Sequence, residues 1–208
     1  MSFGLVKHNN NSISAITSSG QLAQGKMTLL QTQTASSSSS VDFTSNIDST
    51  YPIYLIKIIN AHLDADDRDL RLNFTIDGTN FNVTKTTTFF RATHKEDDSA
   101  TSLDYRTGAD LAQSTGDQVL GEAQDGGSGE ADANICGELL LFNPSSTVFV
   151  KHFICKVSTN ANGALAENAF IAGYGNTTSA ITGIRFNTGG GSATTIDGTF
   201  KLYGIKGS

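Results

Sequence analysis

The pattern of hydrophobic and polar positions is clearest between Tyr51 and Ile76, where two apolar runs flank a short acidic turn. In the second run every other residue is apolar, which is the period of a strand with one buried face. These alternating positions are Leu70, Leu72, Phe74 and Ile76. In the first run neighbouring positions are apolar on both sides, so that strand is expected to be covered on both faces. The stretch therefore predicts a β-hairpin in the middle of a β-sandwich.

A second hairpin is predicted from the apolar runs 135–142 and 147–157. The turn between them is Asn143-Pro144-Ser145-Ser146, in which Pro144 suits the second position of a type I turn. A four-residue loop of this kind places Phe142 opposite Thr147.

The same register places Cys136 opposite Phe153 and diagonal to Cys155. Two states of the cysteines follow from this placement. They are either reduced, buried thiols that pack as small apolar residues, or a cross-strand disulfide. The N-terminus has no pattern of a secretion signal, which favours the reduced thiols.

Shorter apolar segments between turn-rich segments predict the remaining strands. They are Met27–Thr34, Val41–Thr44, Phe81–Thr84 with Phe89 and Phe90 after it, Ala164–Tyr174, Ala180–Asn187 and Ile196–Ile205. A short helix over residues 108–114 is the one helical segment that the pattern suggests. No repeat of 20 to 50 residues is present, which argues against a propeller or a solenoid. The predicted fold is all-β: an antiparallel, jelly-roll-like β-sandwich of about nine or ten strands.

Residues 27–208 are predicted to form this single sandwich, interrupted by a polar, acidic insertion at about 92–133. An insertion of that length with so few apolar residues is usually functional or disordered, so we expect it to face a partner. Residues 1–26 are predicted to be an N-terminal arm, which packs either on its own domain or on a neighbouring subunit. Its candidate interface residues are Phe3, Leu5, Val6, Ile13 and Ile16.

Composition narrows the classes of partner. The 208 residues carry a net charge of −6, and Lys and Arg occur singly, so no basic stripe is available to bind a phosphate backbone. Nucleic acid is therefore not expected as a partner. No window approaches 18 apolar residues, so insertion into a membrane is not expected either.

One acidic cluster resembles the opening of a calcium loop. Its members are Asp64, Asp66, Asp67 and Asp69. Closely spaced carboxylates suit a hard cation, but the turn glycine and the closing glutamate of an EF-hand loop are missing. The favoured interpretation is a solvated hairpin tip, with a calcium site as the alternative.

No catalytic residue and no cofactor are predicted. The four histidines, at positions 8, 62, 94 and 152, show none of the paired spacings of zinc sites. Gly126-Gly127-Ser128-Gly129-Glu130 lacks the final glycine of a nucleophile elbow and follows no apolar strand. The five tyrosines are expected to pack in the core or at its rim, with stacking on sugars as the alternative. The chain is therefore expected not to be an enzyme.

Several segments, in their order along the chain, resemble structural proteins of tailed bacteriophages, especially phages of marine bacteria. They are VDFTSNIDSTYPIYLIKIIN, DLRLNFTIDGT, GELLLFNPSST, IRFNTGG and DGTFKLYGIKGS. The resemblance covers about residues 40–90 and 134–206. It implies a jelly-roll sandwich built into the virion, and it supplies no catalytic residues.

The resemblance leads to a functional expectation: a non-enzymatic capsid-decoration or tail-associated subunit, made in the host cytoplasm and located in the virion. Its expected partners are other copies of itself, as a trimer or a larger ring, and other virion proteins. The alternative is a glycan- or receptor-binding module of a tail or fibre. A glycan binder should show two or more exposed aromatics beside carboxylates or amides in one concave patch.

Overall fold

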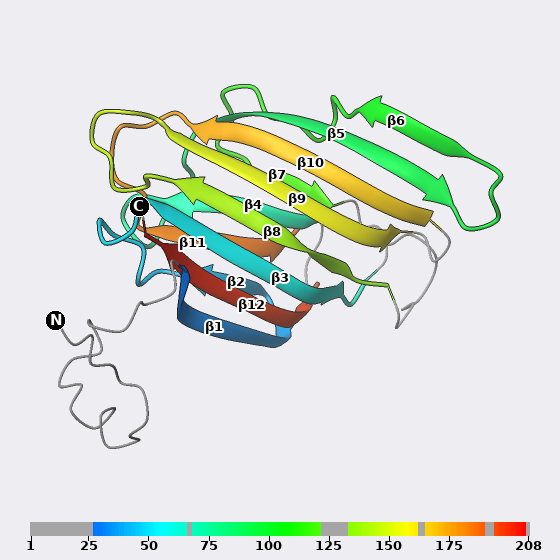
Figure 1. The fold of residues 1–208 in the computed structure, drawn as a ribbon, viewed down its shortest axis with the longest axis horizontal. Coiled ribbons are helices and arrows are strands. Elements are labelled where there is room, and N and C mark those ends of the chain that lie inside the picture. Colours follow the sequence, from blue (N-terminus) through cyan, green and yellow to red (C-terminus); the bar gives the residue numbers. More distant parts are fainter. Residues whose placement is uncertain (1–26, 66–67, 122–132, 162–164, 190–193, 207–208) are drawn as a thin grey trace, which may run out of the picture.

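The computed structural model describes residues 27–65, 68–121, 133–161, 165–189 and 194–206. These residues form two antiparallel β-sheets packed face to face, so the predicted all-β sandwich is confirmed (Figure 1). None of the described residues forms a helix long and apolar enough to cross a membrane.

The larger sheet has eight strands and the smaller sheet has four. In chain order, the larger sheet contains β1 (Met27–Ser38), β3 (Ile53–Leu63), β5 (Lys85–Lys95), β6 (Thr101–Tyr105), β8 (Ile135–Phe142), β9 (Lys151–Ala161), β10 (Leu165–Gly175) and β12 (Ile196–Ile205). The smaller sheet contains β2 (Ser40–Phe43), β4 (Leu70–Thr75), β7 (Gln118–Gly121) and β11 (Gly183–Thr188). Their spatial orders are β1-β12-β3-β8-β9-β10-β5-β6 and β2-β11-β4-β7.

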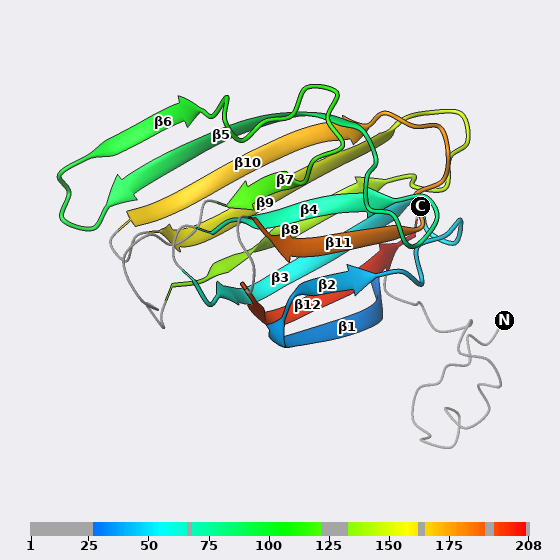
Figure 2. The ribbon, with the colours of Figure 1, turned by 180° about the vertical axis from the view of Figure 1, so that it is seen from behind.

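Eight of the strands follow the order of a jelly roll. The chain pairs β1 with β12, β2 with β11, β3 with β8 and β4 with β7. These four pairs form one long antiparallel ribbon. The ribbon is rolled up so that its strand pairs, taken in order, lie alternately in the larger and the smaller sheet. The pairs β5–β6 and β9–β10 are additions that extend the larger sheet beyond β8. Seen from behind, the smaller sheet lies over the middle of the larger one, and β5 and β6 project past it (Figure 2).

The structure has twelve strands in place of the expected nine or ten. The two strands that were not predicted, β6 and β7, both lie in the polar segment 92–133. Residues 108–114 form turns and bends and an isolated bridge, so the helix suggested there is wrong. The strand predicted over Phe81–Thr84 is also wrong, because within this stretch only Phe81 forms a single isolated bridge, to Thr75.

The predicted central hairpin is wrong, although both of its strands exist. β3 lies in the larger sheet between β12 and β8, whereas β4 lies in the smaller sheet between β11 and β7. The acidic link between them crosses from one sheet to the other. Local turn chemistry suggested direct pairing, but the jelly roll places strands joined by such a link in opposite sheets.

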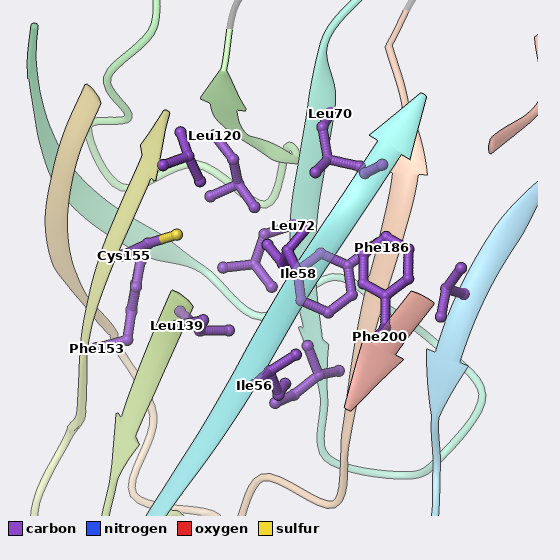
Figure 3. Packing of buried hydrophobic residues seen from close by; sticks show 14 of the residues in the cluster. Ile56, Ile58, Leu70, Leu72, Leu120, Leu139, Phe153, Cys155, Phe186 and Phe200 are labelled. Atoms are coloured by element: carbon purple, nitrogen blue, oxygen red, sulfur yellow. The ribbon is translucent and has the colours of Figure 1, made fainter. Parts of the chain in front are cut away.

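The core lies between the sheets and is made by the inward-facing side chains of both. The apolar face predicted for β4 is confirmed in the strand, where Leu70, Leu72 and Phe74 are fully buried. The other face is not left open as predicted, because Asn73 and Thr75 are buried as well. Aromatic pairs join the two layers: the rings of Phe74 and Phe153 meet edge to face with their centres 5.2 Å apart. Figure 3 shows the inward side chains of both sheets meeting in this core.

The hairpin of β8 and β9 exists, but its register differs from the predicted one. The turn at 143–146 closes as expected, since the Ser146 amide donates to the Asn143 carbonyl at 3.1 Å. The loop then continues to residue 150, so Cys136 lies opposite Ser158 and not Phe153. Because this shift is odd, Cys136 faces outward while Cys155 faces the core. Both cysteines are free thiols, as the sequence favoured, but only Cys155 is buried as expected.

Phe74→Ala is expected to lower the free energy of unfolding by about 3 to 5 kcal/mol, because it leaves a cavity between the sheets. Ile76→Ala is the matched control, since Ile76 lies just beyond β4 and is 43% exposed. Ile76→Ala should lower the free energy of unfolding by less than about 1 kcal/mol. Denaturant unfolding followed by circular dichroism measures both, and equal losses would contradict the placement of Phe74.

Titration with Ellman's reagent is expected to find two thiols in guanidinium but only that of Cys136 in the folded protein. Burial raises the pKa of the Cys155 thiol, and the thiolate is the reacting form. Cys136→Ser should then leave no reactive thiol in the native state. Finding no thiol in guanidinium would mean that the two cysteines form a disulfide.

Candidate functional site

The outer face of the larger sheet carries aligned rows of side chains, because strand pairing sets residues side by side across the sheet. Two neighbouring rows are mostly apolar and cross seven strands from β1 to β5. The first contains Leu29, Tyr203, Leu55, Leu140, Ile154, Ala172 and Thr88. The second contains Met27, Ile205, Ile53, Phe142, His152, Tyr174 and Thr86. We call these two rows the apolar half of the outer face.

The apolar half is open to solvent. Figure 1 looks onto this face, and no described segment crosses it. Met27 and Leu29 are each 50% exposed, and Ile154 is 49% exposed. Leu55, in the middle of the first row, is only 7% exposed, because its neighbours in the sheet pack around it. The apolar side chains therefore form a continuous layer and not isolated exposed residues.

A row of aromatic and charged side chains borders the apolar half. Its members are Tyr105, Phe90, Phe170, Lys156, Glu138, Lys57 and Lys201, which we call the mixed row. The rings of Phe90 and Phe170 stack with their centres 5.1 Å apart, and the Lys156 ammonium lies 5.4 Å from the centre of the Phe170 ring. Lys57 and Glu138 form an ion pair at 2.5 Å. Both are partly exposed, so the pair contributes at most about 1 kcal/mol.

The outward surfaces next to these rows are more polar, although Leu103 of β6 is 77% exposed. Beyond the mixed row, the next row contains Asn168, Ser158 and Cys136. On the smaller sheet, the Asn73 amide donates to Asp117 at 2.6 Å, and the Asn187 amide donates to the same carboxylate at 2.8 Å. The apolar half thus differs from its surroundings, and a contiguous exposed apolar patch of this kind is typical of an interaction site.

A shallow hollow of about 390 Å³ lies within the apolar half. Its floor is low because Ala172, the outward residue of β10 at this point, is small, while larger side chains stand on the neighbouring strands. The rim includes Thr86, Thr88, Phe142, His152, Ile154 and Tyr174. Two aromatic residues therefore face one concavity, but its lining contains neither a carboxylate nor an amide side chain. The hollow suits an apolar side chain better than a sugar.

A loop with two exposed apolar residues adjoins this hollow at the start of β9. Val148 is 70% exposed and Phe149 is 69% exposed. The Ser146 hydroxyl accepts hydrogen bonds from both of their amides, at 3.2 and 3.1 Å. The buried Lys151 ammonium donates to the Phe149 carbonyl at 2.7 Å. Residues 143–150, which we call the Val148–Phe149 loop, are therefore held in place while two apolar side chains project into solvent.

The acidic cluster is only partly within the described residues. Asp66 and Asp67 lie outside them. Asp64 accepts hydrogen bonds from the amide and hydroxyl of Thr195, which lower its pKa, and Asp69 accepts one from Arg71 at 2.9 Å. The two carboxylates thus bind different protein donors. The described part of the chain contains no group of three or more His, Cys, Asp or Glu residues placed to hold a metal ion.

The other predicted candidates are dispersed. The candidate interface residues of the arm, Phe3, Leu5, Val6, Ile13 and Ile16, lie outside the described residues, as do His8 and the segment 126–130. His62 contacts the Ala133 carbonyl at 2.7 Å, and His94 contacts Asp98 at 3.0 Å. His152 lies 5.9 Å from the ring of Tyr174 on the outer face.

The tyrosines divide between the core and the outer face. Tyr54 is buried and Tyr51 packs against it edge to face, as predicted for core and rim residues. Tyr105, Tyr174 and Tyr203 instead lie on the outer face of the larger sheet. Sequence reasoning missed this gathering, because it depends on the order of strands that are distant in the chain. The one indication of this surface in the sequence was that residues on both sides of β3 are apolar.

A buried lysine has the most displaced lysine pKa of the described residues. The Lys85 ammonium donates to the Asn73 side-chain oxygen at 2.6 Å and to the Val83 carbonyl at 2.7 Å. Burial lowers the pKa of Lys85 to about 8, although the charge of Asp117 opposes this shift. The ammonium links β5 to the outer side of β4, and its partners are protein groups, so its role in the described structure is to join the two sheets.

Comparisons with protein-family models, with curated proteins and with solved structures give no significant match to this chain.

The free energy of unfolding is expected to rise by about 2 kcal/mol between pH 8 and 10 through Lys85 alone. In this window the folded protein has released the proton, whereas the unfolded chain still binds it, so raising the pH favours folding. Lys85→Met should abolish this contribution, and Lys156→Met, at an exposed lysine of β9, should retain it. Denaturant unfolding at several pH values measures the free energy of unfolding of each variant. The prediction is contradicted if this free energy rises as much between pH 8 and 10 in Lys85→Met as in the wild type.

Proposed function

We propose that the chain is a non-enzymatic structural subunit of a bacteriophage virion, a capsid-decoration or tail-associated protein that assembles through the outer face of its larger sheet. The observation that carries the proposal is the apolar half: two aligned apolar rows across seven strands of one sheet, open to solvent. A structural subunit needs extended contacts with its neighbours, and this surface offers them.

The size of the surface supports a protein partner. The apolar half crosses seven strands that lie about 4.8 Å apart, and each of its two rows is about 7 Å deep, so its flat area is about 450 Å². With the mixed row beside it the area reaches about 700 Å², close to the roughly 800 Å² that each partner contributes to a stable complex. An apolar area of this size on a soluble subunit is stabilised when another protein covers it.

The placement in a virion depends on resemblance and on fold analogy. The residues that resemble phage structural proteins include β3, β8 and β12, which lie side by side and carry the middle of the apolar half. Jelly rolls serve in viral capsids, and also in lectins and cupins, so the fold alone does not select a function. The partners proposed are other copies of the chain and other virion proteins.

The proposed attachment by the N-terminal arm agrees with where that arm joins the sandwich. Residues 1–26 lead into Met27, which is a corner of the apolar half. The arm therefore enters the fold at the edge of the proposed assembly surface. A glycan-binding role gains no such support, because the lining of the hollow contains neither a carboxylate nor an amide side chain.

Ile154→Arg is expected to reduce incorporation of the protein into virions at least about tenfold, because it buries a charge in the proposed contact. The matched control is Ser158→Arg, which places the same side chain outward on the same strand but beyond the mixed row. Particles purified on a density gradient from infected cells that express each variant are analysed by mass spectrometry.

Circular dichroism should show that both variants fold. The proposal fails if the wild-type protein is missing from purified particles, or if the two arginine variants are incorporated equally well.

A further inference from the structure

We infer that a second copy of this chain covers the apolar half, and that the Val148–Phe149 loop of each copy inserts into the hollow over Ala172 of the other. The inference rests on the proposed function, because it names the partner of the same assembly surface. It replaces the trimer or ring expected from the sequence with a two-fold pair.

The inserted element is preorganised. Phe149 and Val148 project from a loop that is fixed by Ser146 and by the buried Lys151, so ordering it on association costs little conformational entropy. The Lys151 ammonium also donates to the Thr177 carbonyl at 3.2 Å, which ties the loop to the connection after β10. A large, exposed aromatic side chain on a rigid loop has the properties of an interface anchor.

The chemistry of the two parts matches. Residues 143–150 contain no charged side chain, so insertion of the loop requires no charge to leave water. The hollow offers Ile154 and the ring of Phe142 as apolar walls, and threonine hydroxyls at its edge. At about 390 Å³ it has room for a phenylalanine side chain with part of its backbone.

The position of the two parts permits a closed pair. His152 lines the hollow and follows Phe149 by only three residues, so the loop and the hollow are neighbours on one molecule. Neighbouring, complementary features can be exchanged reciprocally about a two-fold axis, which gives each molecule two equivalent contacts and leaves none open. The apolar rows beside the hollow then face each other across the pair.

The first test is the mass of the full-length protein in solution by light scattering. The wild type is expected to have the mass of two chains. The variant Val148→Ser/Phe149→Ser lacks the inserted side chains, and Ala172→Arg fills the hollow. Each is expected to raise the dissociation constant at least about 30-fold. Phe3→Ser/Leu5→Ser, in the arm, should leave the pair intact.

The decisive test mixes the two impaired variants. The loop variant keeps its hollow and the Ala172→Arg variant keeps its loop, so a mixed pair retains one of the two contacts. Mixing should therefore restore association that neither variant shows alone. Non-specific hydrophobic association through the apolar face would not give this complementation between the two variants. Thermal unfolding should show that both variants are folded before they are mixed.

The inference is overturned if the wild type has the mass of one chain or of three, if the loop variant still pairs, or if mixing restores nothing. Loss of the pair in Phe3→Ser/Leu5→Ser would also overturn it, because the arm would then be the occupant. These failures differ from failure of the proposed function, which is absence of the protein from virions. A monomer that is incorporated into particles would retain that function with another virion protein as the partner.

Discussion

The whole structure depends on one constraint: two sheets must bury their inner faces against each other, and neither sheet is formed by a continuous part of the chain. Each of the strands β1 to β4 pairs only with strands from β7 onward. Contacts such as that of Phe74 with Phe153 therefore join segments far apart in sequence as well as the two layers. The buried Lys85 serves the same joining role with polar groups.

The strands added to the jelly roll account for the proposed function. Without β9, β10 and β5 the outer apolar rows would cross only four strands, and the hollow would not exist. The same additions create the Val148–Phe149 loop, which precedes β9. Extension of one sheet beyond its partner thus gives the subunit a broad flat surface and, at its end, an apolar projection.

The sequence predicted strands wherever hydrophobic period and turn residues agreed. The bounds of β8 and β12 match the predicted segments, and the apolar face of β4 meets the core as predicted, although Asn73 and Thr75 on its other face are also buried. Pairing could not be predicted in the same way. A local turn signal cannot show whether the chain returns to the same sheet or crosses to the other, which is why the central hairpin was wrong.

The candidate site was hidden for a related reason. Its rows combine single residues from seven strands, so no short segment contains the pattern. Only β3, apolar at Leu55 on its outward side as well as inward, indicated a second covered face. The predicted register of Cys136 was wrong because the loop continues past the 143–146 turn before β9 begins. Lys151 holds this longer loop, and turn residues alone do not indicate that contact.

The pairing of early strands with late ones also has a consequence for synthesis on the ribosome. When β4 has been made, none of the first four strands has a partner, and β1 must wait for β12, whose last residue is Ile205. At about 5 to 20 residues per second, this delay lasts roughly 6 to 26 s. During that time the nascent chain exposes the apolar residues of β3 and β4, so it is a natural client for the chaperones of the cell that makes it.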